Sequence, residues 1–203
     1  MTSYSNFTLS QIREQFNIAN KRSSLFPNIQ ALPPLDSLQK ALKTARELPL
    51  KSKKARSEMI VVPILLDIRE RNSNFFTIYS GDHLNADEAK GLRGECDFML
   101  ARDTGSFELN TPILQIVEAK KSDIEMGIPQ CAAQMLGASV YNEKEGHPMN
   151  RIYGCVTTGD IWQFMLLENN EIHVDIEKYY LGNLEELIGV FQQIMDYFKT
   201  LPI

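Results

Sequence analysis

Three short runs of apolar and β-branched residues follow one another in the middle of the chain, and they constrain the fold most. They cover Phe75–Tyr79, Cys96–Ala101 and Ile113–Ala119, with turn-forming residues between them. Runs of this length and composition are typical of strands. The short loop at 103–106 predicts that the second and third strands are antiparallel neighbours. The sequence therefore predicts a sheet in the centre of the chain.

Helical patterns flank this sheet on both sides. Between residues 52 and 71, apolar residues recur at helical spacing, but Pro63 lacks a backbone donor and should kink the helix or begin a new one. Pro129 suits the first turn of a helix that reaches about Tyr141. Further elements are expected as helices near 8–19, 35–45 and 184–198 and as strands near 152–157, 161–167 and 171–175. The order predicts an α/β fold.

The length of 203 residues favours a single domain. We expect a helical N-terminal extension over 1–51, a core over 52–158, and a β-hairpin with a C-terminal helix over 159–203. The longest apolar run, Met59–Leu66, has eight residues, against roughly 20 for a membrane helix. No secretory signal follows Met1, so a cytoplasmic protein with reduced cysteines is expected.

Charge is distributed unevenly along the chain. The formal net charge of −5 argues against indiscriminate coating of nucleic acid. Between Lys40 and Arg56, however, seven cations stand against one acid, whereas the segment from Glu168 onward holds seven acids and two cations. This asymmetry predicts either a basic face for a phosphate backbone or an ordinary solvated helix surface.

Carboxylates are the side chains left for chemistry. The three histidines are scattered, and the chain contains no Cys-x-x-Cys pair, phosphate-binding loop or Gly-x-Ser-x-Gly motif. Because side chains alternate along a strand, Glu118 and Lys120 share one face at the end of an apolar run. Asp97 starts the neighbouring strand, so Asp97 and Glu118 can approach one divalent ion. The alternative is a surface ion pair worth about 0–1 kcal/mol.

A polar seam follows on the next helix. Gln130, Gln134, Gly137 and Tyr141 share one narrow stripe at 3.6 residues per turn. A helix face packed in a core would carry Leu or Ile there, whereas this seam can donate hydrogen bonds to a water or a phosphate. Solvent exposure of the stripe is the other explanation.

Asp97, the Glu118-Ala119-Lys120 triplet and the helix bearing both glutamines resemble the Asp…(Asp/Glu)-x-Lys pattern of the PD-(D/E)xK nuclease superfamily. The resemblance implies a restriction endonuclease-like αβββαβ core with a mixed sheet flanked by helices, extra N-terminal helices and a C-terminal helix. Residues 153–159, with Trp162 and Phe164, are similar to nuclease domains of type I restriction motor subunits. Cys96 stands where that family usually has Pro.

The resemblance also implies chemistry. Mg²⁺ or Mn²⁺ would be held by Asp97, Glu118 and, from the first core helix, Glu58, while Lys120 would stabilise charge during phosphodiester hydrolysis. Glu95 shares the strand face of Asp97 and is an alternative ligand. The remaining expected roles are Gln134 as a catalytic residue and Gln130, Lys51, Lys53 and Lys54 as nucleic-acid contacts, with DNA as the expected substrate.

Two other possibilities stay open. A domain that keeps this fold without catalysis would bind nucleic acid or another protein, although the intact Asp97, Glu118 and Lys120 speak against it. A subunit whose nuclease activity requires a partner motor or restriction subunit is also compatible with the chain, as is a homodimer.

Overall fold

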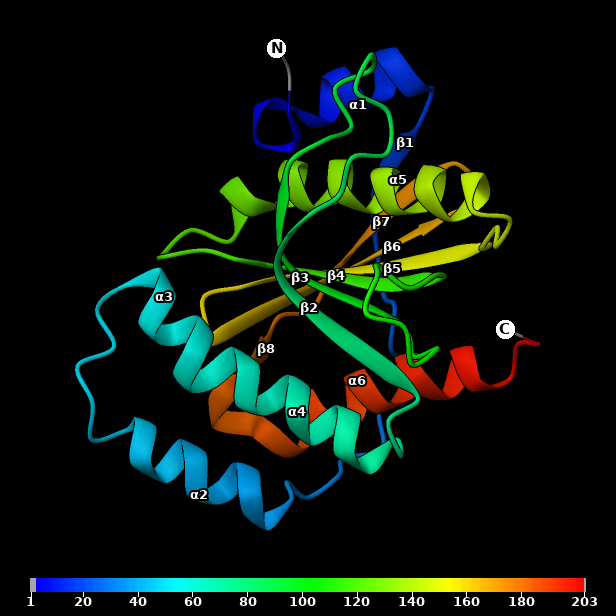
Figure 1. Cartoon of the computed structure of the whole chain (residues 1–203). Helices are drawn as coiled ribbons and strands as arrows, with labels where there is room; N and C mark the ends of the chain where they lie inside the picture. The colour runs from blue at the N-terminus through cyan, green and yellow to red at the C-terminus, as the bar shows by residue number, and fades with distance from the viewer. Residues whose placement is uncertain (1–2, 203) are drawn as a thin grey trace.

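The computed structural model describes residues 3–202, which form a mixed eight-stranded sheet with helices on both faces (Figure 1). The strands are β1 (Ala19–Ser23), β2 (Phe76–His83), β3 (Glu95–Arg102), β4 (Ile113–Ala119), β5 (Arg151–Thr157), β6 (Ile161–Glu168), β7 (Glu171–Asp175) and β8 (Tyr179–Tyr180). The α-helices are α1 (Leu9–Phe16), α2 (Asp36–Ala45), α3 (Lys53–Arg56), α4 (Val62–Arg71), α5 (Ile128–Lys144) and α6 (Leu184–Lys199). Shorter helical turns cover Tyr4–Asn6, Ser57–Val61, Glu125–Gly127 and Leu181–Asn183. The predicted α/β class, with a mixed sheet flanked by helices, is confirmed.

The sheet has the strand order β1-β7-β6-β5-β4-β3-β2, and β8 pairs with β6. The pairs β4–β5 and β1–β7 are parallel, and the other neighbours are antiparallel. A tight turn cannot join parallel strands, so α5 carries the chain from β4 back to the start of β5. All seven residues of β4 are buried, which places this strand in the interior of the sheet.

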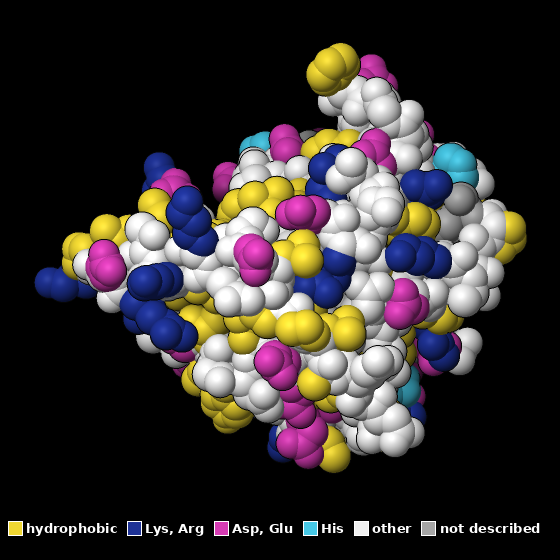
Figure 2. Space-filling model, turned by 90° about the horizontal axis from the view of Figure 1, so that it is seen from below, with side chains coloured by type: hydrophobic (Ala, Val, Ile, Leu, Met, Phe, Trp, Pro, Cys, Tyr) yellow, Lys and Arg dark blue, Asp and Glu magenta, His cyan; other side chains and the backbone are white. Residues whose placement is uncertain are grey.

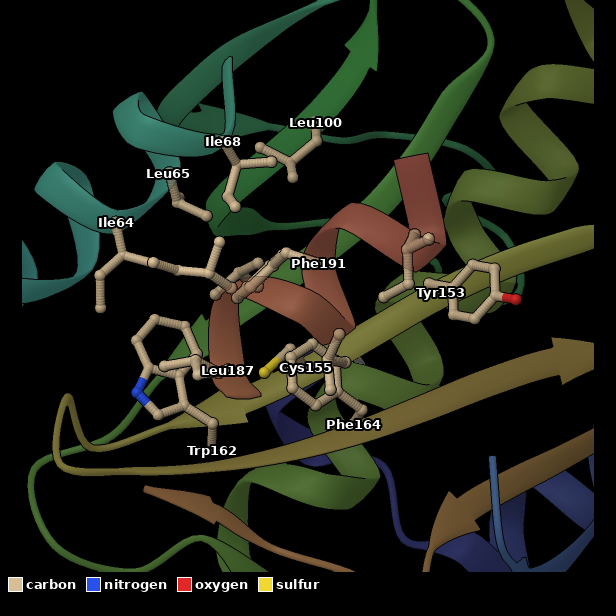
Figure 3. Packing of buried hydrophobic residues seen from close by; sticks show 14 of the residues in the cluster. Ile64, Leu65, Ile68, Leu100, Tyr153, Cys155, Trp162, Phe164, Leu187 and Phe191 are labelled. Carbon is tan, nitrogen blue, oxygen red and sulfur yellow. The ribbon is translucent and has the colours of Figure 1, made fainter. Parts of the chain in front are cut away.

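One hydrophobic core fills each side of the sheet. Helix α6 inserts Phe191 between α4 and the sheet, where its ring meets Trp162 and Phe164 edge-on at centroid distances of 5.7 and 5.1 Å (Figure 3). The other core lies beneath α5 and includes Tyr4 and Ile12 from the N-terminal segment. The sheet is thus covered on both faces, as parallel pairing requires.

The predicted central elements agree with the structure. The runs at Cys96–Ala101 and Ile113–Ala119 lie in β3 and β4, which pair antiparallel as expected. The helix predicted from Pro129 to Tyr141 lies within α5. Before Pro63, the backbone N–H of Val62 donates to the carbonyl of Ser57 in a π-helical turn, and a new α-helix begins. The expected effect of Pro63 is confirmed.

The N-terminal extension is not wholly helical, which corrects the expectation for residues 1–51. Its residues 19–23 form β1 and pair with residues 171–175 of β7 at the edge of the sheet. Four of the five side chains of β1 are exposed. An edge strand that pairs through its backbone does not need alternating apolar and polar side chains. The polar sequence of β1 therefore lacks the pattern by which a strand is predicted.

Cys96, Cys131 and Cys155 are buried free thiols, as expected. Burial raises the pKa of each thiol and keeps it protonated. Within residues 3–202, no helix is long and apolar enough to cross a membrane.

Candidate active site

The neighbouring ends of β3 and β4 bring the predicted acidic residues together. Phe98 pairs with Val117, and continuing this antiparallel register by one residue sets Asp97 opposite Glu118. Asp97 Oδ2 also accepts a hydrogen bond of 2.8 Å from the backbone N–H of Ala119. The Asp97 carboxylate therefore reaches across to the residue that follows Glu118.

Glu118 is the centre of a buried hydrogen-bonded group. Its side chain is only 2% exposed; Oε1 lies 3.0 Å from Lys120 Nζ, and Oε2 accepts from Gln134 Nε2 at 2.9 Å. Lys120 Nζ also donates to Gln130 Oε1 at 2.7 Å. The first part of the predicted seam on α5 therefore faces the acidic strand ends. Solvent exposure does not explain it at Gln134, which is fully buried.

A glycine allows the Lys120 stem to pass beneath the start of α5. A Cβ atom on Gly127 would lie 3.1 Å from Lys120 Cγ and Cε and would also clash with Val156. Any larger residue would displace the lysine or the helix start. The position of the Lys120 ammonium thus depends on this close approach.

The surroundings of Glu118 work against its negative charge. Burial raises the pKa of its carboxyl, the charge of Asp97 raises it further, and Lys120 and Gln134 oppose both effects. The pKa of Glu118 remains raised, so the contacts with Lys120 and Gln134 do not fully offset the effects of burial and of Asp97. A bound cation would favour the ionised form of Glu118.

Asp97 is paired with a lysine from another layer of the fold. Lys53 Nζ, at the start of α3, lies 2.6 Å from Asp97 Oδ1. The Lys53 side chain is 43% exposed and that of Asp97 is 16% exposed. Lys53 was expected to contact nucleic acid with Lys51 and Lys54. In the structure its ammonium lies against Asp97, a candidate metal ligand.

A hollow of about 480 Å³ opens beside Asp97. It is lined by Lys53, Lys54, Ser57, Glu58, Val62, Ser80, Gly81, Glu95, Asp97 and Phe98. Glu58 belongs to the π-helical turn, and its side chain is 52% exposed. Its Oε1 atom lies 3.8 Å from Lys54 Nζ. Glu58 and Glu95, the two further candidate ligands, therefore border the same hollow as Asp97.

Arg56 anchors the α3 segment to the site, a role that the sequence did not indicate. Its Nε donates to the carbonyl of Leu50 at 3.0 Å, and its Nη1 donates to the carbonyl of Lys121 at 3.2 Å. A longer bond of 3.4 Å runs from Nη1 to the carbonyl of Thr158. Arg56 was counted only as one of seven clustered cations, and nothing in its sequence neighbourhood sets it apart.

The other predicted phosphate-contacting cations lie on the surface. Lys51 and Lys54 are exposed, and Lys54 forms a long ion pair of 3.8 Å with Glu58. Figure 2 shows Lys and Arg side chains gathered at the left-hand end of the molecule. In Figure 1 this end holds the segment between α2 and α3. This end adjoins the hollow, because Lys53 and Lys54 line it.

The donor atoms of the site are carboxylate and amide oxygens, the kind that a hard divalent ion prefers. Within residues 3–202, no three Asp, Glu, His or Cys side chains form a group that could hold a metal ion. Two adjacent carboxylates remain, each in contact with an ammonium group. Gln134 Oε1 is buried and has no hydrogen-bond partner in the described part of the chain. Oxygen donors of this kind, completed by waters, fit Mg²⁺ or Mn²⁺.

Comparisons with protein-family models, with curated proteins and with solved structures give no match for this chain.

Proposed function

We propose that this chain is a Mg²⁺- or Mn²⁺-dependent nuclease that hydrolyses phosphodiester bonds, with DNA as its substrate. The element order α4-β2-β3-β4-α5-β5 is the one that the PD-(D/E)xK resemblance implies. The observation that carries the proposal is the buried Glu118, contacted by Lys120 and Gln134, next to Asp97 at the paired strand end. In a surface ion pair the carboxylate would stay in contact with water, whereas the Glu118 carboxylate is buried.

Each residue of the site has a distinct task in this proposal. Asp97 and Glu118 would hold the divalent ion, which when bound polarises a phosphoryl oxygen and lowers the pKa of a bound water. Lys120, fixed by Glu118 and Gln130, holds its ammonium where it can stabilise negative charge that develops on the phosphate. Gln134 orients Glu118 through the 2.9 Å hydrogen bond.

A cleavage assay with a matched lysine control tests the proposal. Plasmid, single-stranded and branched DNA, together with RNA, are incubated with Mg²⁺, Mn²⁺ or chelator. Lys120→Met should lose cleavage by about 100-fold or more, because it removes a fixed donor near the reacting group. Lys121→Met, at an exposed neighbouring position, should retain it. Equal activity of the two variants, or cleavage in chelator, contradicts the proposed mechanism.

A non-catalytic nucleic-acid-binding domain is the second candidate function. The observation in its favour is that lysines already balance both acids, with Lys53 on Asp97 and Lys120 on Glu118. In that case calorimetry detects no Mn²⁺ binding, while DNA binding measured by fluorescence anisotropy is independent of Lys120. Replacing Lys51 and Lys54 by Ala should then reduce the salt dependence of binding. A homodimer or a partner motor subunit remains compatible with either function.

A further inference from the structure

We propose that Lys53 is a resident cation of the candidate site, which occupies Asp97 until a divalent ion displaces it. The lysine then sets the ion concentration at which the site is loaded. This inference rests on the proposed function, because it assigns Asp97 as a metal ligand. It assigns to Lys53 a role in metal loading that comes before the phosphate contact expected of Lys53 and its neighbours.

Both oxygens of the Asp97 carboxylate are engaged. Oδ1 meets Lys53 Nζ at 2.6 Å, and Oδ2 accepts the Ala119 N–H at 2.8 Å. The Ala119 hydrogen bond belongs to the paired strand ends and is fixed by the backbone. A divalent ion therefore competes for Oδ1, where an ammonium group already lies. Two cations on one oxygen repel each other, so binding of the ion must weaken the lysine contact.

The Lys53 side chain is free to leave, in contrast to Lys120. The Lys120 ammonium is held by Glu118 and by Gln130, and the Lys120 side chain is 23% exposed. Within residues 3–202, Asp97 is the one side chain that forms an ion pair with the Lys53 ammonium, and the Lys53 side chain is 43% exposed beside the hollow. Its departure costs one ion pair and no buried hydrogen-bond network.

The backbone of α3 need not move when Lys53 turns away. Ser52 caps the short helix by accepting from the Ala55 N–H at 3.0 Å. Arg56 ties its other end to the carbonyls of Lys121 and Thr158. The exchange is therefore confined to one side chain, and the displaced ammonium stays at the wall of the hollow. There it can pair with a substrate phosphate, so binding of the ion and binding of substrate should favour each other.

Calorimetric titration with Mn²⁺ on the whole chain tests this role without measuring activity. Lys53→Met should bind Mn²⁺ about fivefold tighter than the wild type, because the competing ammonium is gone. Lys53→Gln should show the same direction, and Lys53→Arg, which keeps the cation, should bind like the wild type. Lys121→Met is the control for loss of a lysine charge near the site. Its side chain is exposed and has no role assigned in the site, so we expect no change in affinity.

The outcomes separate this role from the proposed function. If the wild type binds Mn²⁺ and neither Lys53→Met nor Lys53→Gln binds it more tightly, the resident-cation role is wrong and the nuclease proposal stands. If no variant and no wild-type sample binds Mn²⁺, both proposals are overturned together. If Lys121→Met tightens binding as much as Lys53→Met, the effect is one of general charge, and the specific role of Lys53 is refuted.

Discussion

Removing the Lys120 ammonium should destabilise the protein in a manner that depends on pH. Lys120→Met keeps the aliphatic stem, which packs against Gly127, but deletes the charge that lies 3.0 Å from Glu118 Oε1. The Glu118 carboxylate would then retain the hydrogen bond from Gln134 but lose its contacting cation. A buried charge without its partner is among the most destabilising groups in a folded protein.

The structure bounds the size of this loss. Breaking a fully buried ion pair by removing one partner costs about 3–5 kcal/mol. The Lys120 side chain is 23% exposed, so water already screens part of the attraction, and Gln134 still solvates one carboxylate oxygen. We therefore expect the free energy of unfolding to fall by about 2 kcal/mol at neutral pH, below the range for a fully buried pair.

The sign of the pH dependence follows from the pKa of Glu118. Burial, and then Asp97, already hold this pKa above its ordinary value, and Lys120 is one of the groups that lower it. The variant therefore raises the pKa of Glu118 in the folded protein further. Below the unfolded value of about 4.3 the carboxyl is protonated in both states, so the loss vanishes. As pH rises through the folded pKa, the loss grows to its full size.

Urea unfolding at pH 4.5 and pH 7.5 measures both values, with Lys121→Met as the control for a lost surface charge. Glu118→Gln combined with Lys120→Met completes a double-mutant cycle, and it should recover much of the stability because no buried charge remains. An equal loss at both pH values would show that the damage comes from packing. A loss below 0.5 kcal/mol at pH 7.5 would place the pair in the range of a surface ion pair.

Two further predictions concern stability. Both amide atoms of Gln115 are buried and have no hydrogen-bond partner among residues 3–202, so Gln115→Met should raise the free energy of unfolding by about 1–2 kcal/mol. Gln163→Met, which loses 2.7 and 2.8 Å hydrogen bonds to two backbone carbonyls, should lower it. A lower free energy of unfolding in urea for both variants would contradict the first expectation. Gly137→Ala should cost about 1–3 kcal/mol, because its Cβ would meet the buried ring and hydroxyl of Tyr4. Gly182→Ala, in open space, should leave the thermal midpoint nearly unchanged, and equal midpoints for the two glycine variants would refute the packing argument.

The sequence predicts the inner elements of the fold because their patterns are strong. The apolar runs of β3 and β4 carry a clear strand signal, and a proline marks the start of α5. Strand alternation also predicts that Glu118 and Lys120 share a face, and their 3.0 Å contact agrees with it. Local periodicity is enough for these features, since each depends on residues that are near one another in the chain.

The contacts between distant segments could not be predicted in this way. Lys53 and Asp97 are 44 residues apart, and their ion pair depends on how α3 lies over the start of β3. Gln134 could be selected from the sequence because its amide interrupts the apolar residues expected on a helix face that packs in a core. Its partner atom on Glu118, by contrast, follows only from the packing of α5 on the sheet. A single sequence contains no record of such tertiary choices.

The pairing of β1 with β7 has a consequence for synthesis of the protein. Ser23 and His173, joined side chain to side chain across these strands, are separated by 150 residues. At ribosomal rates of about 5–20 residues per second, β1 waits roughly 8–30 s before its partner has been made. An apolar strand exposed for that time would invite aggregation. The charged Lys21 and Arg22 keep the waiting segment hydrated, so the polarity that hides β1 from sequence analysis protects the nascent chain.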